Sequence, residues 1–269
     1  TFNTSPFEGG QLFDSLTMRL NEIIDSPLNF SHAVILLGDT QPDSCIANPR
    51  LSQALNVDSI GSIFIQLKEM GIKPIFTSSE FVFDGEKGGY EETDQALPIL
   101  LYGKQKLEAE RQLFELGVPH TILRLGKVFG IAPNDGTLFT SWFKDLQRGS
   151  IIKCASDQAF SPIFVGDVVE AILRAIKIDL EGTFHVSGNT RFRRIELLEI
   201  LLSEIKAQGH NFNARIEPCS IHDFDLMEKR PLDVSMSAEK IIARANMKFK
   251  NIRTVCREIV SSGLDDAVG

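Results

Sequence analysis

Tyr102 and Lys106 are the residues whose types and spacing most clearly favour chemistry. Lys106 follows Tyr102 by four positions in a segment with helical periodicity, so both side chains project from one face of the predicted helix. A neighbouring ammonium stabilises a phenolate, which lowers the tyrosine pKa from about 10 and makes the hydroxyl a usable proton donor. Lys104 lies on a different face and cannot replace Lys106. The same spacing also fits a surface tyrosine beside a solvated lysine. The position of the pair among the surrounding elements must distinguish a catalytic pair from a surface pair.

The elements around this pair alternate between short apolar runs and longer amphipathic segments. The short runs predict buried strands at Ala33–Leu37, Pro74–Thr77, His120–Leu125 and Gly182–Val186. Helical spacing covers residues 11–24, 47–70, 101–116 and 165–178. This alternation predicts βαβ units, and therefore an α/β fold with a Rossmann-type, doubly wound parallel sheet. The first strand is expected to be buried on both faces, because its residues form an unbroken apolar run.

Functional side chains of such a sheet gather where the strands end. Because the carboxyl ends of parallel strands meet at one edge, the residues after Leu37, Thr77 and Leu125 are expected to line a common crevice. The hydroxyl-rich turn at residues 78–80 falls at that edge. A crossover would place it against the helix of Tyr102, so the sequence predicts a site that combines hydroxyls with the Tyr102–Lys106 pair.

Two runs at this site resemble the extended short-chain dehydrogenase/reductases, and most closely the dTDP-4-dehydrorhamnose reductase group. That group has the pattern S-T-D-Y-V-F-D-G, an acidic stretch and Y-G-x-x-K-L-x-G/A-E; residues 77–94 and 102–110 of this chain are similar to it. The resemblance extends over most of the chain. Further matching segments are Asn48-Pro49, residues 54–57, Arg124 with residues 128–130, Asp157-Gln158, Ser161-Pro162, residues 166–168, Arg230-Pro231 and Ser235-Met236.

The resemblance implies roles for individual residues. Tyr102 would donate a proton to a sugar carbonyl oxygen, Lys106 would lower its pKa and hold the nicotinamide ribose, and Ser79 would hydrogen-bond the same oxygen. The implied cofactor is NAD or NADP, bound by Leu37, Gly38, Asn56, Tyr102, Lys106 and Val128. The implied substrate-binding residues are Glu80, Phe81 and Arg230. Glu80 stands where the group usually has Asp, and Phe81 replaces the Glu of the dehydratase relatives, which argues against dehydration.

One departure from the family concerns its glycine-rich loop. The family begins with a strand and G-x-x-G-x-x-G, whose glycines let backbone amides approach the cofactor pyrophosphate. Gly9-Gly10 is the only glycine pair before Gly38, and it follows no strand-like run. If residues 33–37 match the family's fourth strand, about thirty residues remain upstream, too few for three strands and their crossovers. The first strands are therefore expected to be missing or degenerate, through truncation or through loss of the phosphate cradle.

A second, smaller domain is expected beyond Gly130, where the pattern loosens. We assign residues 1–130 and 160–188 to the dinucleotide-binding domain and residues 131–159 and 189–260 to an α+β substrate domain. Residues 261–269 are expected to form a frayed tail. In the second domain, the basic cluster of Arg191, Arg193 and Arg194 fits either a diphosphate contact or a solvated helix start. Trp142 fits either a sugar-stacking or a core position.

Composition excludes several classes of protein. With 28 Lys and Arg against 36 Asp and Glu the net charge is −8, which disfavours nucleic acid as a partner. No apolar run approaches the roughly 18 residues of a membrane span, so a soluble, cytoplasmic protein is expected. The four cysteines lie far apart and the five histidines are scattered, which predicts reduced thiols and no metal site. A homodimer is expected from the resemblance alone.

The leading functional hypothesis is an NAD(P)H-dependent reductase of a nucleotide-activated 4-keto-6-deoxy sugar, in which Tyr102 protonates the oxygen. A second hypothesis is a non-catalytic binding subunit similar to the regulatory subunit of methionine adenosyltransferase, favoured by the lack of a glycine loop. A third is a sugar-nucleotide epimerase, which would return the hydride and consume no net cofactor.

Overall fold

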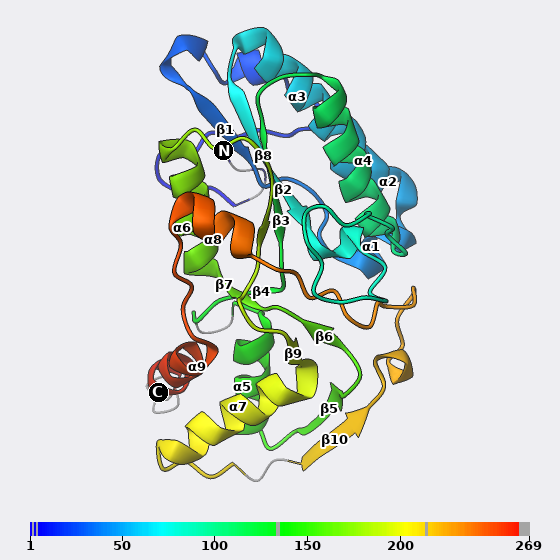
Figure 1. Ribbon diagram of the computed structural model, residues 1–269, viewed down its shortest axis with the longest axis vertical. Coiled ribbons are helices and arrows are strands. Elements are labelled where there is room, and N and C mark those ends of the chain that lie inside the picture. Colours follow the sequence, from blue (N-terminus) through cyan, green and yellow to red (C-terminus); the bar gives the residue numbers. More distant parts are fainter. Residues whose placement is uncertain (2, 4, 133–134, 213–214, 264–269) are drawn as a thin grey trace.

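A parallel four-stranded sheet forms the centre of the computed structural model, which describes residues 1, 3, 5–132, 135–212 and 215–263 (Figure 1). The strand order is β1-β2-β3-β8, with all three neighbouring pairs parallel. The strands are β1 (His32–Ile35), β2 (Lys73–Ser79), β3 (Thr121–Leu125) and β8 (Gly182–Val186). The predicted α/β fold with a parallel sheet is confirmed. Among the described residues no helix is long and apolar enough to cross a membrane.

Helices cover both faces of this sheet, as βαβ crossovers require. Alternate strand residues point to opposite faces: Phe76 and Ile122 pack under α3 (Ser59–Met70) and α4 (Leu101–Glu115). Ile75 and Leu123 instead contribute to the core beneath α6 (Val165–Lys177) and α8 (Glu239–Ala245) (Figure 1). Full burial of β2 between these two layers explains its continuous apolar run.

The predicted helix over residues 47–70 is divided into shorter pieces. The chain forms α1 (Pro42–Ala47), α2 (Pro49–Gln53), a π-helical turn at Ala54–Asp58 and then α3. Pro49 lacks a backbone N–H, and Asn48 before it is non-helical with φ −130° and ψ 65°. The chain therefore restarts a helix at Pro49. Gly71, with φ 68°, ends α3 as predicted.

The predicted helix at residues 11–24 is wrong. The structure contains only a 3₁₀ turn at Leu20–Glu22 in this segment. The Asp14 carboxylate accepts hydrogen bonds from the Leu16 N–H at 3.0 Å and the Thr17 hydroxyl at 2.9 Å, and such local bonds compete with helix formation. The apolar periodicity instead reflects packing of Phe13 and Leu20 into the core beside α3.

The expectation that the first strand is buried on both faces is also wrong. β1 pairs with β2 and is an edge strand of the described sheet. Val34 is 37% exposed and Leu36 is 64% exposed, whereas Ile35 is buried. An unbroken apolar run therefore does not distinguish an edge strand from a central one.

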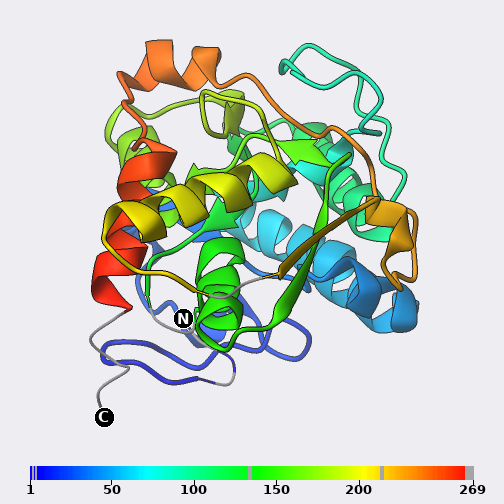
Figure 2. The ribbon, with the colours of Figure 1, turned by 90° about the horizontal axis from the view of Figure 1, so that it is seen from below.

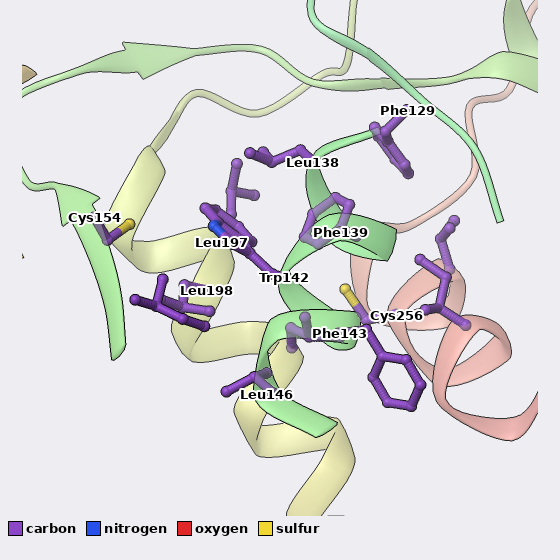
Figure 3. Close-up of a cluster of buried hydrophobic side chains, with 14 of the residues drawn as sticks. Phe129, Leu138, Phe139, Trp142, Phe143, Leu146, Cys154, Leu197, Leu198 and Cys256 are labelled. Carbon is purple, nitrogen blue, oxygen red and sulfur yellow. The ribbon is translucent and has the colours of Figure 1, made fainter. Parts of the chain in front are cut away.

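A second lobe packs around its own core below the sheet in Figure 1, and Figure 2 views the molecule from the side of this lobe. It contains α5 (Leu138–Gln147), β5 (Ile151–Ala155), α7 (Arg194–Ala207), β10 (Arg215–Cys219) and α9 (Ile252–Ser262). Short strands β4 (Val128–Phe129), β6 (Ala159–Phe160), β7 (Ile163–Phe164) and β9 (Phe192–Arg193) connect the two regions. Trp142 is 5% exposed and lies beside Phe139 and Leu197 in this core (Figure 3). Trp142 therefore occupies a core position.

Our division into two domains stays a prediction. At the carboxyl end of the chain, Ser261 and Ser262 belong to α9, so the expected fraying does not begin at residue 261. Residues 264–269 of the expected tail lie outside the described residues.

A buried ion pair joins α4 to β3 and has a large expected effect on stability. Arg124 Nη2 lies 2.7 Å from Glu110 Oε2, with side chains 9% and 6% exposed. We expect Glu110→Ala to lower the free energy of unfolding by about 3–5 kcal/mol, because it leaves a guanidinium buried without a counter-charge. Urea unfolding measures this loss. The exposed Glu170–Arg174 pair on α6 is the control, and Glu170→Ala should cost about 0.5 kcal/mol or less. A similar small loss for Glu110→Ala would contradict the assignment.

Candidate active site

A cavity of about 630 Å³ lies between the carboxyl edge of the sheet and the second lobe. Its sheet side consists of the end of β2 with the following turn, the face of α4 with Tyr102 and Lys106, and residues 125–128 after β3. Residues 40–43, which follow β1, complete this side. The three strand ends therefore line one crevice, as the topology predicts. The second lobe contributes the opposite wall. Its lining residues are Gln158, Phe160, Arg194, Ile221, Phe224, Leu226, Arg230 and Val234.

Tyr102 and Lys106 lie on the cavity face of α4 and are 6% and 2% exposed. Lys106 Nζ donates a 3.0 Å hydrogen bond to the backbone oxygen of Thr77 and lies 6.0 Å from the centre of the Tyr102 ring. This bond fixes the ammonium at the end of β2. The surface alternative for the pair, a solvated lysine beside an exposed tyrosine, does not describe these buried side chains.

The pKa values of this pair are governed by burial. Burial raises the pKa of Tyr102, and its hydrogen bond with Ser79 acts in the opposite direction. Burial lowers the pKa of Lys106 to about 8, while Glu110 one turn later raises it. The expected lowering of the tyrosine pKa by Lys106 is not found, because burial dominates the shift and Lys106 is not among its causes. Tyr102 keeps its proton near neutral pH and can donate it.

Ser79 joins this pair because β2 ends there. Its hydroxyl accepts the N–H of Phe81 at 3.2 Å, which caps the turn Glu80–Val82, and it lowers the pKa of the nearby Tyr102. Two hydroxyls at the same end of the cavity can both address one substrate oxygen. Ser79, Tyr102 and Lys106 are thus brought together at one end of the cavity.

The other residues expected to bind the cofactor take different positions. Val128 lines the cavity, whereas Leu37 packs against the core beside α3 and its neighbour Leu36 lines the cavity instead. Asn56 is fully buried and accepts the Asp39 N–H at 2.7 Å, which holds the loop after β1. Gly38 sits against it with φ 132°; a Cβ there would lie 2.5 Å from Asn56 Oδ1 and 3.8 Å from Lys106 Nζ. Gly38 and Asn56 therefore support the cavity wall near Lys106.

The three residues expected to bind substrate all line the cavity. Glu80 is 3% exposed, its Oε2 has no hydrogen-bond partner, and burial raises its pKa. The Phe81 ring lies edge-on to Tyr102 with centroids 6.2 Å apart. Arg230 Nη2 forms an ion pair with Asp43 Oδ1 at 2.7 Å.

Two further cations line the same cavity, Lys127 and Arg194. Sequence reasoning missed Lys127, and it left Arg194 open between a diphosphate contact and a solvated helix start. Lys127 lies two residues after the end of β3 and directly before Val128, and this position at the carboxyl edge of the sheet was the signal that could have found it. Arg194 is the first residue of α7. Its neighbours Arg191 and Arg193 pair with Asp233 and Glu196 at the surface, so only one member of the basic cluster reaches the cavity.

A parallel sheet whose carboxyl edge presents a tyrosine, a lysine and a serine to a cavity defines the short-chain dehydrogenase/reductase class. Residues 31–264 match the family model of the RmlD substrate binding domain. The chain belongs to this family, and the resemblance to the dTDP-4-dehydrorhamnose reductase group is confirmed. The family includes sugar-nucleotide reductases.

Curated relatives and solved structures are similar over much of the chain. A probable low-salt glycan biosynthesis reductase of Haloferax volcanii is 30% identical over 81% of this chain and 74% of its own length. Methionine adenosyltransferase 2 subunit beta of Bos taurus is 31% identical over 59% of this chain, which spans half of that relative.

Among solved structures, a hypothetical dTDP-4-dehydrorhamnose reductase of Sulfolobus tokodaii has a TM-score of 0.80 at 24% identity and covers 94% of this chain and 88% of its own. A dTDP-4-dehydrorhamnose reductase of Bacillus anthracis in complex with NADP has a TM-score of 0.76 at 21% identity, covering 86% and 80%. At these identities, the two solved structures show that the fold is shared.

Proposed function

We propose that this protein is an NAD(P)H-dependent reductase of a nucleotide-activated 4-keto-6-deoxy sugar. The observation that supports it most is that Ser79, Tyr102 and Lys106 line one cavity, in which Lys106 Nζ is held by its 3.0 Å hydrogen bond to the Thr77 backbone oxygen. Membership of a family with sugar-nucleotide reductases supports the same class of substrate.

The chemistry of these residues follows from their protonation states. A bound nicotinamide cofactor supplies the hydride that reduces the keto carbon. Tyr102 gives its proton to the carbonyl oxygen, and Ser79 donates a hydrogen bond to that oxygen as its negative charge develops. The Lys106 ammonium stabilises the phenolate left on Tyr102. One hydride and one proton convert the ketone into an alcohol, so atoms and charge balance.

The residues near Lys106 fit one part of a dinucleotide cofactor. Lys106 is a buried hydrogen-bond donor beside the close Gly38–Asn56 approach, and we assign the nicotinamide ribose to this end of the cavity. Gly38 has no Cβ there, which lets the loop after β1 pack closely against Asn56 beside Lys106. The 269 residues contain no G-x-x-G-x-x-G, so we assign no pyrophosphate cradle. NAD and NADP are both retained as cofactors.

Glu80, Phe81 and Arg230 are the substrate-binding residues of this proposal. The unpartnered Glu80 oxygen can pair with a sugar hydroxyl, because an unsatisfied buried oxygen gains most from such a bond. The Phe81 ring offers an apolar contact next to Tyr102. Arg230 lies at the opposite wall, where the activated end of the substrate can reach it.

Nicotinamide absorbance tests the reaction class. We expect dTDP-4-dehydrorhamnose to cause net oxidation of NADPH or NADH, with one cofactor consumed for each ketone reduced. An epimerase would leave the cofactor concentration unchanged at the end of turnover while altering the sugar. No loss of absorbance with either cofactor, and no altered sugar, would reject both enzyme hypotheses.

A non-catalytic subunit is the second candidate. It is favoured by 31% identity over 169 residues to methionine adenosyltransferase 2 subunit beta. A stable stoichiometric complex with a second enzyme, formed by protein that binds neither NADH nor NADPH in calorimetry, would support this candidate over the reductase. Micromolar binding of either cofactor would favour the reductase. A homodimer stays a prediction in both cases.

A further inference from the structure

The cavity of a chain with net charge −8 is lined by more cations than carboxylates. Its cationic lining is Lys106, Lys127, Arg194 and Arg230, and its acidic lining is Asp43 and Glu80. Two of the cations have partners inside the site, since Lys106 bonds to Thr77 and Arg230 pairs with Asp43. The excess positive charge therefore resides on Lys127 and Arg194.

Lys127 is held in the cavity by its backbone. Its carbonyl oxygen accepts the Ile163 N–H at 2.9 Å, which fixes the backbone at the cavity edge, and Lys127 lowers the pKa of the nearby Glu80 carboxyl. Glu80 also attracts the Lys127 ammonium, but no carboxylate among the described residues lies within 4.0 Å of it. Because burial raises the pKa of Glu80, this carboxyl neutralises the lysine only in part.

Arg194 is held by neutral groups. Its Nη1 donates to Gln158 Oε1 at 3.3 Å, and its guanidinium lies 5.8 Å from the Trp142 ring centre. Neither contact compensates the charge. Lys127 and Arg194 repel each other, which lowers the pKa of Lys127 together with burial. Lys127 is exposed and Arg194 is half-buried, so both cations remain accessible to an anionic ligand in the cavity.

We propose that Lys127 and Arg194 form a subsite for an anionic oxygen group of the substrate. This inference rests on the proposed function, since it names a chemical feature of the ligand in the same cavity. The anion is either the diphosphate that activates the sugar or a carboxylate on the sugar ring. Glu80 directly follows Ser79, and its carboxyl attracts the Lys127 ammonium, so the subsite adjoins the residues proposed to act on the keto group.

Calorimetric titration of the whole chain tests the subsite with inorganic pyrophosphate, UDP-glucose and UDP-glucuronate as probes. If the anion is the diphosphate, Lys127→Met should raise the Kd of all three by about tenfold or more, as expected for a lost charge-assisted hydrogen bond. If the anion is a sugar carboxylate, only UDP-glucuronate should lose that affinity. Arg194→Gln should weaken the same probes as Lys127→Met, and Lys127→Arg should retain their binding.

Lys104→Met is the matched control, because Lys104 is an exposed lysine of α4 outside the cavity lining. It should leave all three Kd values unchanged. Equal binding by Lys127→Met and wild type, or failure of wild type to bind any probe, would overturn the subsite. Turnover is not part of the readout. Protein that binds anions through Lys127 but reduces no keto sugar would reject the proposed function and retain the subsite.

Discussion

Replacing Tyr102 by phenylalanine is expected to lower kcat/KM for keto-sugar reduction by about 10²–10⁴-fold, the usual contribution of a positioned general acid. The substitution removes only the hydroxyl, which lies in the same cavity lining as Ser79. It keeps the ring that packs edge-on against Phe81. We therefore expect the variant to fold and to retain its affinity for cofactor, with the loss confined to turnover measured by nicotinamide absorbance.

Tyr90→Phe provides the control, because Tyr90 is the other of the two tyrosines in the chain. Its hydroxyl accepts N–H groups from Gly85 and Lys87 at 3.1 Å and donates to Asp84, and Tyr90 does not line the cavity. We expect about 1 kcal/mol of lost stability and unchanged kcat/KM. If Tyr102→Phe turned over as fast as Tyr90→Phe, Tyr102 would not be the proton donor.

Lys106→Met is expected to lower kcat/KM by about 10²-fold or more, because it removes the charge that stabilises the phenolate. In the wild type the ammonium is the active form and burial lowers its pKa to about 8. Activity should therefore be full below pH 8 and fall as pH rises through that value. In a pH profile, the residual activity of Lys106→Met should not show this fall, whereas Lys104→Met should keep it.

Stability data separate this catalytic loss from unfolding. The unfolded chain has the ordinary lysine pKa of about 10.4, above the folded value, so it binds more protons between pH 8 and 10.4. The Lys106 contribution to the free energy of unfolding therefore rises with pH in that window. Lys106→Met should remove this rise. A wild-type stability that falls over the same window, with no difference from the variant, would contradict the buried ammonium.

The sequence was most informative where local pattern and tertiary position agree. β2 is buried on both faces, so the strand could be predicted from its apolar run and its position in the site from the hydroxyl residues at its end. α4 presents Tyr102 and Lys106 on one face because their spacing matches the helical period. Predicting that Ser79 lies near Tyr102 required only the further assumption that a βαβ crossover brings the two elements together.

Other features depend on interactions that no local pattern reveals. Asp14 replaces the predicted helix at residues 11–24 by its own side-chain hydrogen bonds, and Pro49 divides the next one. Lys127 and Arg194 line one cavity only because the second lobe packs against the carboxyl edge of the sheet. Their sequence separation made that cationic wall unpredictable from spacing.

The most direct test of the reductase centre is transfer of deuterium from nicotinamide C4 to the sugar. With a deuterated cofactor, wild type should yield a reduced sugar that carries one deuterium at the former keto carbon, detected by mass spectrometry. Tyr102→Phe should bind the same cofactor and yield almost no labelled product. Sugar that changes without gaining deuterium, or labelled product from Tyr102→Phe at the wild-type rate, would contradict the account.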